Sequence, residues 1–181
     1  FGKINYSFAE RYLVSATVRY DGSSRFGKNN RFGTFPAFSL GWRLSEEAFI
    51  KDNTDVISDL KLRFGWGQTG NQEIDNYATY NIYTTDYGIG DPTWGAVLGT
   101  AYNITGKGTG TLLSGFKMNQ RGNDNLKWET TTQTNIGLDF GLFNQSLYGS
   151  AEYYMKKTKD ILVKPPYLAA IGEGGNRWIN G

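Results

Sequence analysis

The 181-residue chain contains no cysteine and no histidine. Disulfide bonds, thiolate zinc sites, imidazole metal ligands, cysteine nucleophiles and histidine general bases are therefore excluded. Without these groups we expect neither an enzyme nor a bound cofactor. No run of about 18 apolar residues occurs, which excludes a transmembrane helix. The 19 basic and 17 acidic residues leave a net charge of +2, which gives no sign of nucleic-acid binding.

Glycine and aromatic residues are abundant instead, at 24 residues and 15% of the chain respectively. The mean hydropathy of −0.49 is compatible with a membrane β-barrel, because barrel strands alternate lipid-facing and lumen-facing side chains. The sequence starts inside a strand-like pattern, stops in a turn-like stretch and shows no secretion signal. We therefore expect a fragment of a longer chain.

Period-two alternation of apolar and polar residues predicts at least six β-strands. They cover residues 2–9, 12–20, 34–44, 60–68, 128–141 and 147–158. Residues 45–52 carry a serine followed by early acids, which indicates one helical turn. Residues 77–85 are compatible with a further strand inside a long surface loop that spans about residues 70–127.

The connections between these strands alternate in length. Residues 10–11 and 142–146 are short turns, whereas residues 21–33 and 70–127 are long loops. Bacterial outer-membrane barrels show this alternation, with strands of about 9–11 residues, short periplasmic turns and longer extracellular loops. The alternative is a soluble secreted β-sandwich that binds carbohydrate through its aromatic loop, because a sandwich also exposes a polar face. Aromatic residues near strand ends suit the interfacial girdles of a barrel, namely Tyr12, Tyr20, Trp42, Trp66, Trp128, Phe140 and Tyr153.

Charged residues occupy polar positions of the predicted strands. We expect these side chains to face the lumen of a barrel: Arg19, Arg43, Lys61, Arg63, Glu129, Asp139 and Glu152. The three acids are the only plausible acid/base set on adjacent strands. A glycosidase pair needs its two carboxyl groups about 5–9 Å apart in a cleft, so we expect no catalysis from them.

Gly65, Gly67 and Gly70 have the G-x-G-x-x-G spacing of a dinucleotide-binding turn. That turn follows a buried strand and opens a helix. Here the strand alternates, contains Trp66 and is followed by no helical apolar stripe. We therefore predict a barrel strand in which Gly65 and Gly67 leave room on the lumen side.

Four stretches closely resemble the SusC/RagA family of TonB-dependent outer-membrane transporters from Bacteroidetes, namely RYDGSSRFGKNNRFGTFPAFSLGWRLSEEAFIKD, ISDLKLRFGWGQTGNQEI, NLKWETTTQTNIGLDFGL and LYGSAEYYMKKTKDIL. The resemblance covers nearly the whole chain except residues 77–120. It implies an all-β fold in which about 6–8 antiparallel transmembrane strands form part of a barrel of about 22 strands. Residues 1–181 would then belong to one barrel domain, without its plug domain.

The same resemblance implies location in the bacterial outer membrane and TonB-dependent import of large nutrients, either glycans or oligopeptides. It also implies three kinds of partner. These are a SusD-like surface lipoprotein that acts as a lid, the TonB complex through an absent N-terminal part, and membrane lipid or lipopolysaccharide.

The long loop combines aromatic, amide and carboxylate side chains, which suit sugar faces or peptide side chains. The candidate contacts to a substrate or to the lid are Asn71, Gln72, Tyr77, Tyr80 and Trp94, and packing of the loop against itself is the alternative. In the loop of residues 21–33, Arg25, Lys28 and Arg31 suit lipopolysaccharide phosphates. The interpretation that we favour is a solvated loop that forms its own hydrogen bonds, including one with Asp21.

Overall fold

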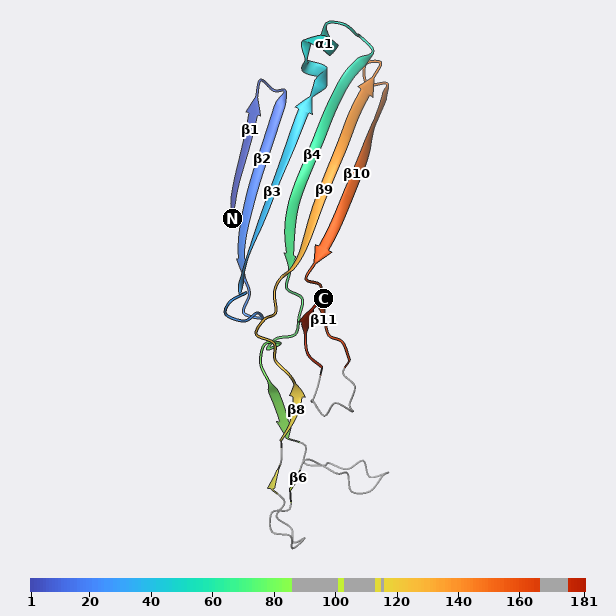
Figure 1. Ribbon diagram of the computed structural model, residues 1–181. Coiled ribbons are helices and arrows are strands. Elements are labelled where there is room, and N and C mark those ends of the chain that lie inside the picture. Colours follow the sequence, from blue (N-terminus) through green and yellow to red (C-terminus); the bar gives the residue numbers. More distant parts are fainter. Residues whose placement is uncertain (86–100, 103–112, 115, 167–175) are drawn as a thin grey trace. The chain divides into compact units, whose positions relative to one another are not determined.

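The computed structural model describes residues 1–85, 101–102, 113–114, 116–166 and 176–181 (Figure 1). Its main element is a six-stranded antiparallel sheet in the order β1-β2-β3-β4-β9-β10. The strands are β1 Gly2–Phe8, β2 Tyr12–Gly22, β3 Phe32–Arg43, β4 Ile57–Asn71, β9 Glu129–Leu142 and β10 Leu147–Lys159. Each pairs with its neighbour in the chain, except that β4 pairs with β9 across the long insertion. The predicted all-β antiparallel fold is confirmed.

Most predicted strand ends lie within two residues of the observed ones, but two predictions differ by more. Strand β4 was expected over residues 60–68 but runs from Ile57 to Asn71, because its backbone pairs with β9 as far as Asn71 and Glu129 whatever side chains it carries. Of residues 77–85, only Ile82–Thr85 form a strand, β5. The preceding residues form a turn, in which Tyr77 adopts a left-handed φ of 65°.

Short strands occur in the region expected as one long loop. Strand β5 pairs with β8, Phe116–Gln120, and β6, Ala101–Tyr102, pairs with β7, Leu113–Ser114. Near the end of the chain, β11, Leu162–Val163, pairs with β12, Ile179–Asn180.

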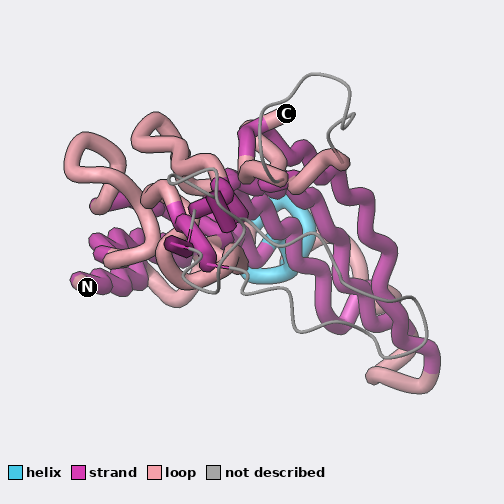
Figure 2. Tube along the Cα trace, turned by 90° about the horizontal axis from the view of Figure 1, so that it is seen from below, coloured by secondary structure: helices cyan, strands magenta, loops and turns pink. Residues whose placement is uncertain are grey.

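The connections at one end of the six-stranded sheet are short or helical. The β1–β2 turn has left-handed residues at Ala9 and Glu10, with φ of 49° and 55°, which suits the twist of a tight hairpin. Between β3 and β4 lie a 3-10 turn, η1 Leu44–Glu46, and one helical turn, α1 Ala48–Lys51, as residues 45–52 predicted. Figure 2 shows this segment as the only helical part of the described chain. No helix within the described ranges is long and apolar enough to cross a membrane.

The chain divides into two compact units. The first comprises Phe1–Ser23, Arg31–Gln72 and Trp128–Ile161 and contains the six-stranded sheet. The second comprises Ser24–Asn30, Glu73–Lys127 and Leu162–Gly181. The first unit buries little: Phe35, at 6% exposure, packs edge-to-face on Trp128 with ring centroids 5.4 Å apart. The second has a small apolar core formed by Phe26, Ile74, Ala78 and Leu126.

Candidate functional site

One face of the six-stranded sheet is apolar and is not covered by any described part of the chain. Because successive side chains of a strand point to opposite faces, the register brings alternate residues of each strand together. One row across the sheet consists of Ile4, Ala16, Phe38, Trp66, Thr134 and Met155. Ile4 is 73% exposed and Met155 59% exposed. A continuous exposed apolar surface of this kind marks an interaction with lipid or protein.

Aromatic rings gather at both ends of this apolar face. At the end with the short connections, Tyr12 stacks between Phe8 and Trp42, with ring centroids 6.3 and 6.2 Å away. At the other end, which we call the loop end, Tyr20 stacks on Phe32 at 5.1 Å. Tyr12 and Tyr20 lie eight residues apart on β2, or about 27 Å at 3.4 Å per residue. The apolar band of an outer-membrane barrel is about 25 Å tall.

Trp66 departs from the predicted girdle. It lies in the middle row of the apolar face, 5.4 Å from the ring of Phe38, because β4 continues beyond it to Asn71. Trp128 packs on Phe35 and also directs its indole N–H at the carbonyl of Arg31, 3.4 Å away.

The seven side chains expected to face the lumen all project from the opposite, polar face of the sheet. Arg43, Lys61 and Asp139 are direct neighbours on β3, β4 and β9, and Arg63 and Glu152 flank Gly137 one row further on. Arg19 and Glu129 occupy the same face nearer the loop end. That this face lines a lumen stays a prediction.

Two polar side chains lie flat across glycines of the adjacent strand on this face. Arg63 crosses Gly137, where an added Cβ would be 3.0 Å from Nη2, and Nη2 donates to Asp139 Oδ1 at 2.8 Å. Nε lies 2.8 Å from Oδ2 without the alignment of a hydrogen bond. Asn135 lies over Gly65, and its Nδ2 donates to Glu152 at 2.9 Å. The small residues thus make room for cross-strand polar contacts.

The glycine triad has no nucleotide-binding geometry. Gly65, Gly67 and Gly70 all lie inside strand β4, and residues 72–85, which follow that strand, form no helix. Gly67 faces the Cβ of Ala37, and Gly70 lies under the ring of Phe35. Their lack of side chains is used for packing within the sheet.

The three acids do not come together at one place on the sheet. Glu129 accepts a hydrogen bond from Asn71 at 3.3 Å and lies ten residues from Asp139 on β9, about 34 Å along the strand. Asp139 is paired with Arg63, and Glu152 with Asn135. Among the described residues, no group of three His, Cys, Asp or Glu side chains is placed to hold a metal ion.

A shallow groove of about 530 Å³ crosses the polar face. Its floor is a row of small or short polar residues, one from each of five neighbouring strands: Asn5, Ser15, Ser39, Gly65 and Asn135. Lys61 and Arg63 contribute to its wall.

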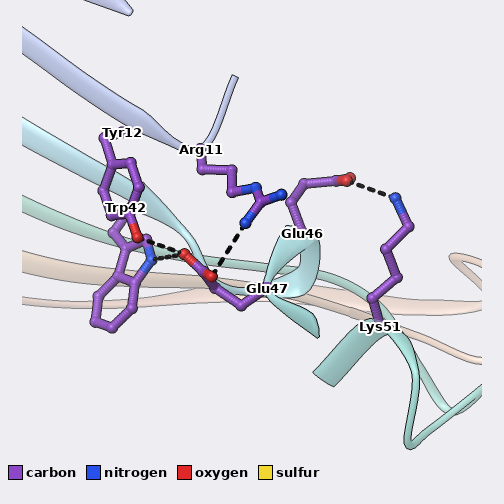
Figure 3. Close-up of polar contacts among 6 residues, drawn as sticks. All are labelled: Arg11, Tyr12, Trp42, Glu46, Glu47 and Lys51. Atoms are coloured by element: carbon purple, nitrogen blue, oxygen red, sulfur yellow. Dashed lines mark hydrogen bonds and ion pairs between the residues drawn. The ribbon is translucent and has the colours of Figure 1, made fainter. Parts of the chain in front are cut away.

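Glu47 organises a polar cluster at the short-connection end (Figure 3). Its Oε1 accepts hydrogen bonds from the Tyr12 hydroxyl at 2.7 Å and the Trp42 indole N–H at 3.0 Å. Its Oε2 accepts one from Arg11 at 3.3 Å. These contacts join the β1–β2 turn, β2 and β3 to the helical connection. The hydrogen bonds from Trp42 and Tyr12 hold the pKa of Glu47 below its usual value of 4.5.

Sequence reasoning assigned the acids of residues 45–52 to helix capping and missed this cluster. Glu47 is the N-cap of α1, but its side chain makes no capping hydrogen bond. Neighbouring Glu46 pairs with Lys51 at 3.0 Å, and the bond from Lys51 lowers the pKa of Glu46. No local signal in the sequence reveals a contact that spans 35 residues, from Tyr12 to Glu47.

The loop candidates are only partly brought together. Tyr77 and Tyr80 are 68% and 62% exposed, with ring centroids 6.3 Å apart. Buried Gln120 holds their turn, because its amide donates to the carbonyls of Tyr77 at 2.8 Å and Tyr80 at 3.2 Å. Asn71 and Gln72 belong to the other compact unit. Trp94 lies outside the described residues.

Asp75 ties together parts of the second unit. Its Oδ2 accepts hydrogen bonds from Lys164 at 2.6 Å and from the Trp178 indole at 3.0 Å. These bonds hold the pKa of Asp75 below its usual value. The carbonyl of Trp178 in turn accepts a bond from Asn123 at 2.9 Å.

Comparison with known proteins identifies relatives along the whole chain. Residues 1–181 match the family described as TonB dependent receptor-like, beta-barrel. The TonB-dependent receptor SusC of Bacteroides thetaiotaomicron is 44% identical over 168 residues, covering 90% of this chain and 15% of the relative. The TonB-dependent receptor P3 of Formosa agariphila is 38% identical over 166 residues, covering 92% of this chain and 15% of the relative.

Solved structures agree with these sequence matches. The RagAB peptide importer in its closed-closed state has a TM-score of 0.76 and 28% identity, covering 98% of this chain and 17% of that chain. In its open-open state the TM-score is 0.74 at 29% identity, with the same coverage of 98% and 17%. This chain therefore spans only 15–17% of the length of these relatives. With matches of this extent, it belongs to the SusC/RagA family of TonB-dependent receptors and represents part of their β-barrel.

Proposed function

We propose that the chain forms a wall segment and extracellular loops of an outer-membrane transporter that imports large nutrients with energy from TonB. The observation that carries this proposal is the six-stranded sheet with one uncovered apolar face and one charged face. In a barrel wall, lipid covers the apolar face and the charged face lines the interior. Family membership supports the same role for the whole protein.

The direction of the strands follows from their connections. Short turns lie on the periplasmic side of bacterial outer-membrane barrels, and longer loops lie outside the cell. The β1–β2 and β9–β10 turns and the helical β3–β4 connection are then periplasmic, and the Glu47 cluster marks that boundary. Within the described residues no second sheet packs on the apolar face, which disfavours the alternative of a soluble carbohydrate-binding β-sandwich.

Substrate and partners are inferred from the relatives. One matched structure is a peptide importer, and SusC is a TonB-dependent receptor. Import of either glycans or oligopeptides is compatible with the exposed Tyr77 and Tyr80. We infer a SusD-like lipoprotein as the lid and a plug segment that reaches the TonB complex. Asn71, Gln72 and Trp94 are the remaining proposed contacts to substrate or lid.

Uptake by the full-length transporter tests this proposal. Tyr77→Ala and Tyr80→Ala are introduced together into the complete gene, and uptake of labelled oligosaccharide and oligopeptide pools is measured in intact cells. Loss of one or two aromatic contacts, each worth about 1 kcal/mol, is expected to lower uptake of one pool about fivefold or more.

Tyr153→Ala is the matched control, because Tyr153 is 72% exposed but lies on the apolar face of β10. Its uptake is expected to equal that of the unmodified protein. Recovery of the protein in the soluble fraction rather than with outer membranes would contradict transport altogether. Unchanged uptake of both pools by the double variant would show that Tyr77 and Tyr80 do not contact the substrate.

A further inference from the structure

The apolar face of the sheet carries charge at one place only. The strand positions of this face hold no acid, and their only cations are Lys157 and Lys159 at the loop end of β10. Lys156, between Met155 and Lys157, points to the opposite face. A charge on a lipid-facing surface is costly unless it reaches the membrane interface. The presence of two cations close together on this face therefore calls for a functional explanation.

Neither lysine is neutralised by a described residue. Both are exposed, and neither has a side-chain partner in the part of the chain that the structure describes. The residues directly opposite them on β9 are Thr132 and Thr130, and the next strand presents Gln68 and Gly70. All of these neighbours are uncharged. The nearest acid along the chain, Asp160, follows the end of β10.

The lysines lie at the loop end of the face, where Tyr20 stacks on Phe32 at 5.1 Å. They stand two residues apart on one side of a strand, so their Cα atoms are about 7 Å apart. Two flexible ammonium groups at this spacing can converge on one phosphate or contact two neighbouring ones.

Another exposed cation, Arg31, precedes β3 at the same end of the sheet, outside the strand positions of the apolar face. The carbonyl of Arg31 is held by the Ser23 N–H at 2.9 Å and by the Trp128 indole at 3.4 Å. The Arg31 side chain is exposed and has no partner among the described residues. Asp21, its expected partner, is instead bound by Arg19 at 2.8 Å. The interpretation of Arg31 as part of a solvated loop that forms its own hydrogen bonds stays a prediction, because Arg31 is exposed and its carbonyl accepts a bond from Ser23 of the same loop.

We propose that Lys157 and Lys159 form a binding site for the phosphate groups of a glycolipid in the outer leaflet of the surrounding membrane. The inference rests on the proposed function, which puts the apolar face in lipid and the loop end outside the cell. Basic residues at the membrane surface attract anionic headgroups, and a face without acids offers no competing partner. Lysine stems lie along the apolar surface while their ammonium groups reach the headgroup level.

Lipid retention by the purified full-length transporter tests the site. Native mass spectrometry is used to compare binding of diphosphoryl lipid A, the same lipid A after removal of its phosphates, and phosphatidylglycerol. We expect the unmodified protein to retain diphosphoryl lipid A in preference to both others. Lys157→Gln with Lys159→Gln should reduce this retention about tenfold, since each surface lysine contributes a share of the attraction.

The matched control is Lys156→Gln, which removes the same charge from the same strand but on the opposite face. It should leave retention unchanged, and Lys157→Arg with Lys159→Arg should preserve it. If the double Gln variant does not assemble, the two single variants are measured, each with an expected loss of about threefold.

Three results would overturn the site: equal retention by the double Gln variant, equal binding of dephosphorylated lipid A, or an equal loss with Lys156→Gln. Equal binding of phosphatidylglycerol would overturn the assignment to a glycolipid. Fractionation separates this inference from the proposed function. A transporter that is found with outer membranes but is indifferent to lipid phosphate refutes the site alone, whereas one that never reaches the outer membrane refutes the function.

Discussion

Gly122 determines the geometry of the exposed tyrosine turn at the scale of a single residue. A Cβ at this position would collide with the backbone carbonyl oxygen of Thr79, which cannot move without moving the turn. The N–H of Gly122 also donates to Asn81 at 2.9 Å. A flexible side chain could move away from an added Cβ, but these neighbouring atoms belong to the backbone and cannot. A larger residue at position 122 therefore has no low-energy conformation.

Gly122→Ala is therefore expected to destabilise the turn of residues 75–81 by about 1–3 kcal/mol, the usual cost of overpacking. Hydrogen exchange of the full-length transporter, followed by mass spectrometry, should show faster exchange in peptides from this turn. Gly2→Ala is the control, because nothing lies within 4 Å of a Cβ at Gly2. Exchange rates that do not change in the Gly122 variant would mean that the turn adapts.

Glu47 makes the stability of the short-connection end of the sheet sensitive to acid. Its pKa is lowered in the folded chain by hydrogen bonds from Trp42 and Tyr12, so its contribution to stability is fully present above the usual glutamate value of 4.5. That contribution is lost as the pH falls through the lowered pKa of the folded state. Below it, Glu47 is protonated and accepts the three bonds more weakly.

We expect Glu47→Gln to lower the urea midpoint of the assembled transporter at neutral pH, and the difference from the unmodified protein to shrink as the pH falls below 4.5. The urea midpoint is measured on gels of unheated samples, as the urea concentration at which half of the folded band is lost. Glu10→Gln serves as the control, since Glu10 lies in the adjacent turn and has no side-chain partner among the described residues. A difference in urea midpoint that is constant across this pH range would show that the charge of Glu47 does not stabilise the short-connection end.

At the scale of the element, side-chain alternation predicted the long strands well. Tyr12, Val14 and Ala16 repeat with the period of the pleat, and β2, β9 and β10 appear where this pattern lies. The later end of β4 escaped prediction because its pairing with β9 continues through Thr69, Gly70 and Asn71, which have no apolar side chain to continue the alternation. The turn at Tyr77 escaped because Gln120, far along the chain, holds it.

The candidate site was predictable only in part for the same reason. Alternate residues of a strand face the same side of the sheet. The pattern of apolar and polar residues was therefore enough to predict that Arg63 and Asp139 share a face. Their direct pairing across β4 and β9 depends on a register that joins strands on either side of the insertion. The Glu47 cluster depends on the path of the helical connection, which local patterns do not determine.

Strand β9 offers a direct test of the two faces. Thr134 and Ile136 lie on its apolar face, and Gln133 and Asn135 on its polar face. The 181 residues contain no cysteine, so single cysteines can be introduced at these positions and labelled with a fluorophore. In bilayers that contain spin-labelled lipid, we expect quenching at positions 134 and 136 to exceed quenching at 133 and 135 by about twofold or more. Uniform quenching along the strand would exclude a barrel wall.

At the scale of the whole molecule, the sheet is open at both sides. Strands β1 and β10 are its edges, and each has one side without a backbone partner in the described sheet. In lipid every unpaired N–H and C=O group costs several kcal/mol, so only closed barrels and helices cross a membrane. In water the same edges, next to an uncovered apolar face, promote association with other chains.

The 181 residues expressed alone are consequently expected neither to form a closed barrel nor to transport. The six-stranded sheet and the three two-stranded sheets bury little apolar surface. Large apolar side chains of the main sheet stay exposed, with Ile4 at 73% and Tyr153 at 72%. We expect the isolated chain in detergent to be polydisperse by native mass spectrometry and to conduct no ions or solutes in liposomes. The full-length transporter is the control and should be a discrete species. A folded, monomeric and closed species of the isolated chain, with a strand-rich circular dichroism spectrum and cooperative unfolding, would contradict this expectation. In that case the edges β1 and β10 would have to pair with each other, and the sheet would be a small complete barrel rather than part of a larger wall.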